Sequence, residues 1–258
     1  METNNNKELV MTSLDNGVLR IGLQRPEKRN ALTLAMYDAM TTAIESAECD
    51  NQVRVILIHG TENCFTSGND LSDFAKNPPT GENSPVSRFL RTLSQAKKPV
   101  IAMVSGPAVG IGTTLLLHCD LIYADETAKF QLSFVNLGLC PEAASSYLLP
   151  KLVGHLQASE LLLLGEMIDA EKAAEIGLVN RVFPHTDLYK QVLSKAEQLA
   201  VQPPDSVRLT KSLLKENQTR LVAEVMSKEG KLFVSMLAKP EAQEAISAFI
   251  EGRKPNFS

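Results

Sequence analysis

The chain has 258 residues, and its 26 basic and 30 acidic side chains give a net charge of −4. Hydrophobic residues make up 44% and charged residues 22%, a balance that excludes a disordered or fibrous chain and is typical of a globular protein. The small negative charge does not favour nucleic-acid binding, although a local basic patch could still hold a small polyanion. A chain of this length is expected to form one large domain, or one domain with an appendage.

Four cysteines, at positions 49, 64, 119 and 140, have neither CxxC spacing nor a nearby histidine at metal spacing. We therefore expect no disulfide framework and no metal site, and four free thiols are typical of a reducing compartment. The longest apolar runs, such as residues 161–164, are far shorter than the ~20 residues that cross a membrane. Because the N-terminus is polar and the last residues are not Ser-Lys-Leu, the expected location is the cytoplasm.

Signals for strands and helices alternate through the first half of the chain. Residues with β-branched side chains or alternating polarity predict strands at 9–14, 17–23, 53–59, 100–104 and 121–124. Apolar periodicity predicts helices at 33–49 and 113–119. This alternation indicates an α/β architecture with parallel strand pairing.

From about residue 190 onward the sequence carries helix signals alone. Helices separated by prolines are predicted at 191–200, 204–217, 221–237 and 240–251. The predicted organisation is therefore an α/β core at 1–190 and a helical region at 191–258. Residues 76–88 are rich in proline and glycine and have no period, so a mobile loop is predicted there.

Two glycine-containing turns follow predicted strands, at residues 64–71 and 106–112. One interpretation is that glycine only supplies the unusual dihedral angles of a tight turn. The other is that free backbone N–H groups at the turn and at the following helix face an anion. Neither GxGxxG nor a phosphate-binding loop with Gly-Lys-Ser/Thr is present, so a nucleotide site is not indicated.

The two turns belong to a longer series of motifs. In order these are RPEKRNAL (25–32), FTSGNDL (65–71), KPVIA (98–102), the segment 106–120, LG (164–165) and AAEIGLV (173–179). Their order and spacing, from about residue 8 to the C-terminus, resemble the crotonase (enoyl-CoA hydratase/isomerase) superfamily. The resemblance implies a ClpP-like spiral of repeated ββα units with a C-terminal helical trimerisation region. It also implies an acyl-CoA thioester substrate, a homotrimer or dimer of trimers, and no cofactor besides the CoA of the substrate.

The resemblance assigns the glycine turns a catalytic role. In this family two backbone N–H groups form an oxyanion hole for the thioester oxygen, and the matching donors here are those of Asn69 and Ile111. Ser67, Gly68 and Gly110 are the adjoining residues expected to contact substrate. Such donors stabilise the enolate that forms when a proton leaves the carbon beside the thioester, and one donor is typically worth ~10²–10³ in rate.

The carboxylates depart from the hydratase pattern. Hydratases use two glutamates to activate a water, and the corresponding residues here are Thr114 and Phe134, neither of which is a base. Glu142 occupies the position at which Δ3,Δ2-enoyl-CoA isomerases carry their catalytic glutamate, and its apolar surroundings are expected to raise its pKa. The alternative is that Glu142, after Pro141, only begins a helix.

Further residues are predicted to hold the substrate. Arg25, Lys28 and Arg29 could bind CoA phosphates, although they could equally form a solvated turn. Phe233 and Phe249 match aromatics that the family places near the CoA adenine across the trimer, with ordinary core packing as the alternative. The acyl pocket is expected to include Leu71 and Phe74, beside residues 76–88. The four histidines are predicted to be structural or exposed rather than members of a triad.

Three functions remain open at this point. The first is a Δ3,Δ2-enoyl-CoA isomerase of fatty-acid oxidation, in which Glu142 alone shuttles a proton from C2 to C4. The second is a hydratase or another crotonase reaction. The third is a CoA-binding scaffold without turnover, which would need neither an intact oxyanion turn nor Glu142.

Overall fold

The computed structural model describes residues 9–77, 81 and 83–257. Its larger sheet has the order β1-β2-β3-β4-β6-β9, and a smaller sheet has the order β5-β7-β8. The larger sheet is formed by β1 (Val10–Asp15), β2 (Val18–Leu23), β3 (Val55–His59), β4 (Val100–Val104), β6 (Leu121–Asp125) and β9 (Arg181–Phe183). The smaller sheet is formed by β5 (Pro107–Val109), β7 (Lys129–Gln131) and β8 (Met167–Asp169).

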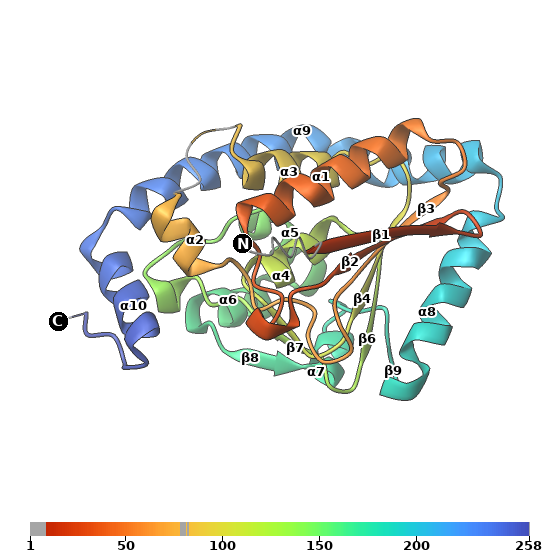
Figure 1. The fold of residues 1–258 in the computed structure, drawn as a ribbon. Helices are drawn as coiled ribbons and strands as arrows, with labels where there is room; N and C mark the ends of the chain where they lie inside the picture. The colour runs from red at the N-terminus through yellow and green to blue at the C-terminus, as the bar shows by residue number, and fades with distance from the viewer. Residues whose placement is uncertain (1–8, 78–80, 82, 258) are drawn as a thin grey trace, which may run out of the picture.

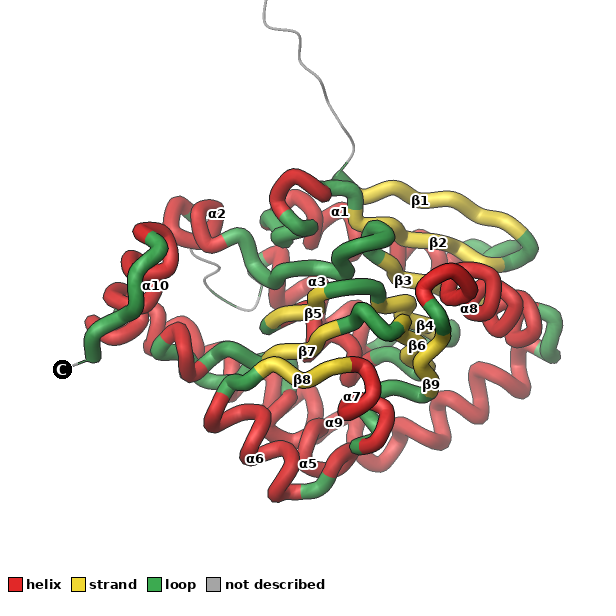
Figure 2. Tube along the Cα trace, turned by 90° about the horizontal axis from the view of Figure 1, so that it is seen from below, coloured by secondary structure: helices red, strands yellow, loops and turns green. Residues whose placement is uncertain are grey.

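Strand pairing follows a spiral. The hairpin β1–β2 is antiparallel, and every later pair in the larger sheet is parallel. Within each of the pairs β4/β5 and β6/β7, the first strand enters the larger sheet and the second enters the smaller sheet. Successive units therefore stack, with the two sheets running together through the core (Figure 2). The predicted α/β architecture with parallel pairing is confirmed.

Helices cover the sheets and extend beyond them (Figure 1). No helix among the described residues is both long enough and apolar enough to cross a membrane. The α-helices are α1 (Leu34–Cys49), α2 (Leu71–Lys76), α3 (Pro85–Ser94), α4 (Ile111–Thr114), α5 (Ser145–Val153), α6 (His155–Leu164), α7 (Ala170–Glu175), α8 (His185–Ala200), α9 (Pro204–Leu237) and α10 (Pro240–Glu251). Short 3₁₀ helices are η1 (Pro26–Lys28), η2 (Leu115–His118) and η3 (Val135–Leu137).

The central strands are buried on both faces. In β3, Val55 and Leu57 belong to a cluster with the apolar stripe of α8, whereas Ile56 and Ile58 belong to the main core with α1 and α3. Because helices cover both faces, these strands read as continuous apolar runs, as expected of parallel sheets. This arrangement makes the sheet a rigid support for the loops at its edges.

Three element predictions need correction. The helices expected at 204–217 and 221–237 form one helix, α9, because residues 218–220 are polar but compatible with helix. The helix expected at 113–119 begins at Ile111 and continues as the 3₁₀ helix η2. The loop expected at 76–88 includes the start of α3, where Ser84 caps the helix and Pro85 occupies its first turn. Residues 78–80 and 82 of that loop lie outside the described residues.

The helical region is fastened to the core. The boundary expected between residues 190 and 191 falls inside α8, whose apolar face packs on the larger sheet. On α9, the ammonium group of Lys211 lies 2.6 Å from a carboxylate oxygen of Asp120 and donates to the carbonyl oxygen of Lys98 at 2.7 Å. The beginning of α9 therefore adheres to the α/β core, and an oligomerisation role for residues 191–258 stays a prediction.

Candidate active site

The two glycine turns predicted to act together lie side by side. The N–H of Thr66 donates to the carbonyl of Pro107 at 3.0 Å, and the N–H of Val109 donates to the carbonyl of Thr66 at 3.0 Å. A Cβ added to Gly68 would lie 2.9 Å from the carbonyl oxygen of Val109, so this close approach requires glycine. Segments some forty residues apart in sequence thus form one site.

Two backbone N–H groups at this junction are unpaired. Among the hydrogen bonds of the described residues, none is donated by the N–H of Asn69 or of Ile111. Ile111 is the first residue of α4, so its N–H has no carbonyl partner within the helix. Gly110, which precedes it, has φ 57° and ψ −117°, a conformation that is accessible essentially to glycine alone. Both N–H groups are therefore available to donate to a bound ligand, as the predicted oxyanion role requires.

The side chain of Asn69 is also held in place. The hydroxyl of Tyr37, on α1, donates to Asn69 Oδ1. Tyr37 is fully buried, and burial together with the charge of nearby Glu142 holds the pKa of its phenol well above the ordinary value. The phenol therefore stays neutral and donates a hydrogen bond beside the predicted oxyanion donor.

Glu142 lies against the same short helix. The hydroxyl of Thr114, three residues after Ile111 on α4, donates to Glu142 Oε1. Both side chains are buried. Thr114, one of the two residues that replace a hydratase carboxylate, is thus a direct partner of the remaining carboxyl group.

The surroundings of Glu142 change its proton affinity. Burial raises its pKa to about 8, with the nearby charge of Glu229 adding to the rise and the hydrogen bond from Thr114 opposing it. A carboxyl group with a pKa near neutrality can both accept and return a proton. The expected rise through desolvation is confirmed.

The alternative interpretation of Glu142 as a helix start is wrong. Helix α5 begins only at Ser145, and Glu142 precedes it in a turn whose next residues, Ala143 and Ala144, have φ values of 60° and 56°. Pro141 and Glu142 are therefore outside the first turn of α5. The carboxyl group of Glu142 does not cap that helix.

The three predicted aromatic residues have different environments. Phe134 is buried and packs edge to face on Phe233 of α9, with ring centroids 6.5 Å apart. Phe249 on α10 is 67% exposed. The ring of Phe233 thus makes an internal contact, whereas Phe249 is available to another molecule.

The three predicted cationic residues also differ. A guanidinium nitrogen of Arg25 donates to Asp70 at 2.6 Å and to the carbonyl of Ala31 at 2.8 Å, so this side chain fastens its own turn. Lys28 and Arg29 are exposed, and the carbonyl of Arg29 accepts from the N–H of Ser67 at 2.9 Å. Two of the three cations therefore lie beside the first glycine turn with their side chains exposed to solvent.

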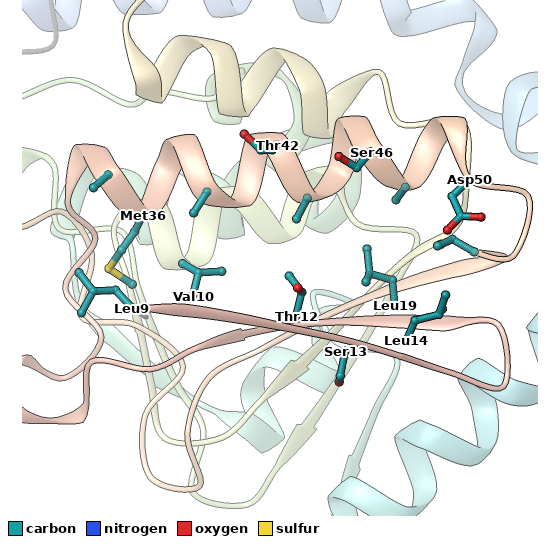
Figure 3. A pocket seen from close by; sticks show the side chains of 15 residues that line it. Leu9, Val10, Thr12, Ser13, Leu14, Leu19, Met36, Thr42, Ser46 and Asp50 are labelled. Carbon is teal, nitrogen blue, oxygen red and sulfur yellow. The ribbon is translucent and has the colours of Figure 1, made fainter. Parts of the chain in front are cut away.

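The predicted acyl-contact residues lie on α2, directly after the oxyanion turn. Phe74 is buried in the main core, and Leu71 is partly exposed. A groove of about 920 Å³ lies elsewhere, between the hairpin β1–β2 and α1, where Val10, Thr12 and Leu14 point toward α1 (Figure 3). None of the predicted site residues lines that groove, so it is separate from the Glu142 site.

Ser105, Asp125 and His185 meet in space without forming a relay. The hydroxyl of Ser105 donates to Asp125 Oδ2, and Nδ1 of His185 lies 2.7 Å from the same oxygen. A catalytic triad needs the imidazole between hydroxyl and carboxylate. Here both groups bond the carboxylate directly, so the cluster is structural, as expected for His185.

Sequence reasoning missed Tyr37, His118 as a contact of the Glu142 turn, and Glu229. Nε2 of His118 lies 2.8 Å from the carbonyl oxygen of Ala143, and burial lowers the pKa of His118 to about 4, so the ring is neutral. Glu229 accepts hydrogen bonds from the N–H groups of Ala144 and Ser146. Glu229 is one of many charged residues along α9, and its sequence surroundings gave no signal that it would be buried.

Comparison with known proteins identifies the family of this chain. The family profile described as enoyl-CoA hydratase/isomerase matches residues 13–258. The solved structure of an enoyl-CoA hydratase/isomerase from Pseudoalteromonas atlantica T6c superimposes with a TM-score of 0.93 at 41% identity, covering 97% of this chain and 100% of that one. The chain therefore belongs to the enoyl-CoA hydratase/isomerase family, the crotonase superfamily, and has its fold.

Curated relatives of this chain carry the names of different reactions. Enoyl-CoA delta isomerase 2 of Rattus norvegicus is 34% identical over 97% of this chain, which spans 65% of the length of that relative. The 2,3-dehydroadipyl-CoA hydratase of Escherichia coli K12 is 33% identical, over 96% of this chain and 98% of that protein. Membership of the family is thus shown, and the particular reaction must be argued from the site.

Proposed function

We propose that this protein is a Δ3,Δ2-enoyl-CoA isomerase that uses Glu142 as a single proton shuttle. The observation that carries the proposal is that the buried carboxyl group of Glu142 accepts a hydrogen bond from Thr114. Thr114 lies on α4, the same short helix whose first residue, Ile111, has an unpaired N–H. Phe134 stands where a hydratase would carry its second glutamate. The site therefore offers one acid–base group and no second carboxylate for holding water at that position.

The reaction follows from these groups. The carboxylate of Glu142 takes a proton from C2 of a 3-enoyl thioester, and the electron pair moves to the thioester oxygen as a dienolate. The N–H groups of Asn69 and Ile111 stabilise that oxygen through hydrogen bonds. Glu142 then returns the proton to C4, the double bond moves to C2–C3, and the carboxylate is regenerated. Such a step needs neither metal nor redox cofactor.

The substrate fits the surfaces around this centre. The exposed cations Lys28 and Arg29 would meet CoA phosphates, and Leu71 and Phe74 would face the acyl chain. We also propose a homotrimer or a dimer of trimers. Its support is the large exposed apolar side chains on the outer helices, at Leu156, Leu163, Leu214, Phe249 and Ile250. Light scattering of the full chain tests this assembly, and a monomer at micromolar concentration would contradict it.

A product assay separates the three functions. Wild-type protein is incubated with 3-enoyl-CoA and, separately, with 2-enoyl-CoA, and products are resolved chromatographically. An isomerase forms 2-enoyl-CoA from the first substrate and little 3-hydroxyacyl-CoA from the second. Hydration at a rate comparable with isomerisation would favour the second candidate, which the name of the Escherichia coli relative supports. CoA binding without either product would indicate the scaffold.

A further inference from the structure

The turn that carries Glu142 has a strained backbone. Ala143 and Ala144 are both left-handed, with φ 60° and 56°, although alanine rarely adopts this conformation. Each such residue costs on the order of 1–3 kcal/mol and persists only where the surroundings hold it. The position of Glu142 therefore depends on whatever holds the following residues.

Glu229 of α9 holds them. Its Oε2 accepts from the N–H of Ala144 at 2.6 Å, and its Oε1 accepts from the N–H of Ser146 at 3.0 Å. Glu229 is only 6% exposed, so water does not compete freely for these bonds. Alanine at the N-cap of α5 has no acceptor side chain, and a carboxylate from a helix some eighty residues further along the chain supplies one instead.

The other side of the turn is held from the core. His118 of η2 bonds the carbonyl of Ala143 at 2.8 Å, and the hydroxyl of Ser145 donates to the carbonyl of Glu142 at 2.6 Å. Thr114 holds the carboxyl group itself. Glu229 is thus the one partner of the turn that comes from α9, whereas the other partners belong to the α/β core or to the turn itself.

We propose that Glu229 is a positioning residue, which keeps the backbone of 144–146 in place so that the Glu142 carboxyl lies against Thr114. This inference rests on the proposed function of Glu142 as the proton shuttle. The hydrogen bonds of Glu229 go to the backbone of Ala144 and Ser146, so its effect on the reaction passes through the turn that carries Glu142. The titratable groups of the turn that experience its charge are Glu142 and Cys140, and in both cases that charge raises the pKa.

The test is Glu229→Gln, which keeps the shape but loses one acceptor and the negative charge. We expect kcat for 3-enoyl-CoA, measured on the plateau at high pH where Glu142 is ionised, to fall ~10–10²-fold, since displacing a catalytic group by about 1 Å can cost that much. KM should change little. Removing a nearby negative charge should also lower the pKa of Glu142, seen in the pH profile and in carboxyl titration by infrared difference spectroscopy. Glu229→Asp, which keeps the charge, should restore part of kcat.

A control and a second variant keep the test decisive. Glu224→Gln removes an exposed carboxylate from the same helix, where it pairs with Arg220, and should leave kcat and the titration unchanged. If Glu229→Gln does not fold, the same substitution is made in an Ala144→Gly background. Glycine adopts the left-handed conformation without strain, so the turn should fold there, and the double variant is compared with Ala144→Gly alone. The proposal would be overturned if Glu229→Gln kept the wild-type kcat and left the titration of Glu142 unchanged. It would also be overturned if the two glycine variants did not differ in these quantities.

The outcome is separable from the proposed function. The infrared signal of Glu142 is assigned as the one absent from Glu142→Gln, so its shift in Glu229→Gln is measured without turnover. Full activity of Glu142→Gln would refute the shuttle and leave the positioning of Glu142 by Glu229 standing on the titration. Loss of activity in Glu142→Gln with no effect of Glu229→Gln would refute the positioning alone.

Discussion

The two halves of the candidate site are built differently. The two glycine turns are backbone structures: Gly68 lets one turn approach the other closely, Gly110 adopts a conformation suited to glycine, and the N–H groups of Asn69 and Ile111 donate none of the hydrogen bonds found among the described residues. The Glu142 turn is assembled by side chains from separate segments, namely Thr114, His118 and Glu229. A donor made from backbone tolerates many side chains, whereas a positioned base depends on each of its partners. Mutations should therefore act on the two halves in different ways.

Replacing Glu142 should have the largest effect. Glu142→Gln is nearly isosteric and removes the base, so kcat for isomerisation should fall ~10²–10⁴-fold, the usual contribution of general acid–base catalysis. The Kd for CoA should stay within a factor of about two, because the proposed role of the carboxyl is toward the acyl part of the substrate and not toward the nucleotide. Steady-state kinetics and calorimetry measure the two quantities. A variant that kept more than a tenth of wild-type kcat would require another shuttle residue.

Changing the backbone at Gly110 should lower kcat by somewhat less than replacing Glu142. Gly110→Ala forces an L-residue into φ 57° and ψ −117°, and the Ile111 N–H should rotate out of position. Loss of one oxyanion donor predicts a ~10²–10³-fold decrease in kcat. Gly154→Ala is the matched control, because Gly154 also has a positive φ and open space for a Cβ but lies between α5 and α6. Equal loss of kcat in both variants would show a general folding defect instead.

The pH dependence of kcat should depend on the hydrogen bond between Thr114 and Glu142. Because the base form of Glu142 is required and its pKa is about 8, kcat should rise with pH and level off above about 8. Thr114→Val removes a hydrogen bond that favours the charged form, so the profile should move to higher pH. A bond to a charged group is worth about 1.5–3 kcal/mol, and one pKa unit about 1.4 kcal/mol, which predicts a shift of ~1–2 units.

At pH 7 this shift corresponds to a ~10–10²-fold decrease in rate, which alkaline pH should recover. Thr113→Val is a matched control on the same helix, because its hydroxyl bonds the carbonyl of Ala108 rather than Glu142. A Thr114→Val profile that coincides with wild type would show that the hydroxyl does not set the proton affinity of Glu142.

Removing exposed cations should have the smallest effect. Lys28→Gln/Arg29→Gln should raise the Kd for CoA ~2–30-fold, since exposed ion pairs are each worth about 0.2–1 kcal/mol and two are removed. The increase should shrink at high salt, and kcat should not change. Lys190→Gln/Lys195→Gln, which removes two exposed cations of α8, serves as a charge-matched control. An unchanged Kd at low salt would mean that this turn is merely solvated.

The sequence alone determined the architecture and the backbone half of the site. Runs of β-branched residues and apolar periods are local signals, so β3, β4, α1 and α10 lie close to their predicted positions. The turns at Gly68 and Gly110 could be predicted from the sequence, because both residues have a positive φ, a conformation that glycine adopts most readily. The family resemblance then indicated Asn69, Ile111 and Glu142 without any knowledge of contacts.

Only the tertiary structure decided what holds Glu142. Three contacts join segments that are tens of residues apart in the sequence. Thr114 bonds the carboxyl of Glu142, Glu229 of α9 bonds the turn after Glu142, and Arg25 pairs with Asp70. The same packing joined two predicted helices into α9 and placed Phe233 against Phe134. A polar residue on an amphipathic helix has the same local pattern whether it faces solvent or a buried turn. Its environment is set by what the rest of the chain packs against it, and that information is absent from any short window of sequence.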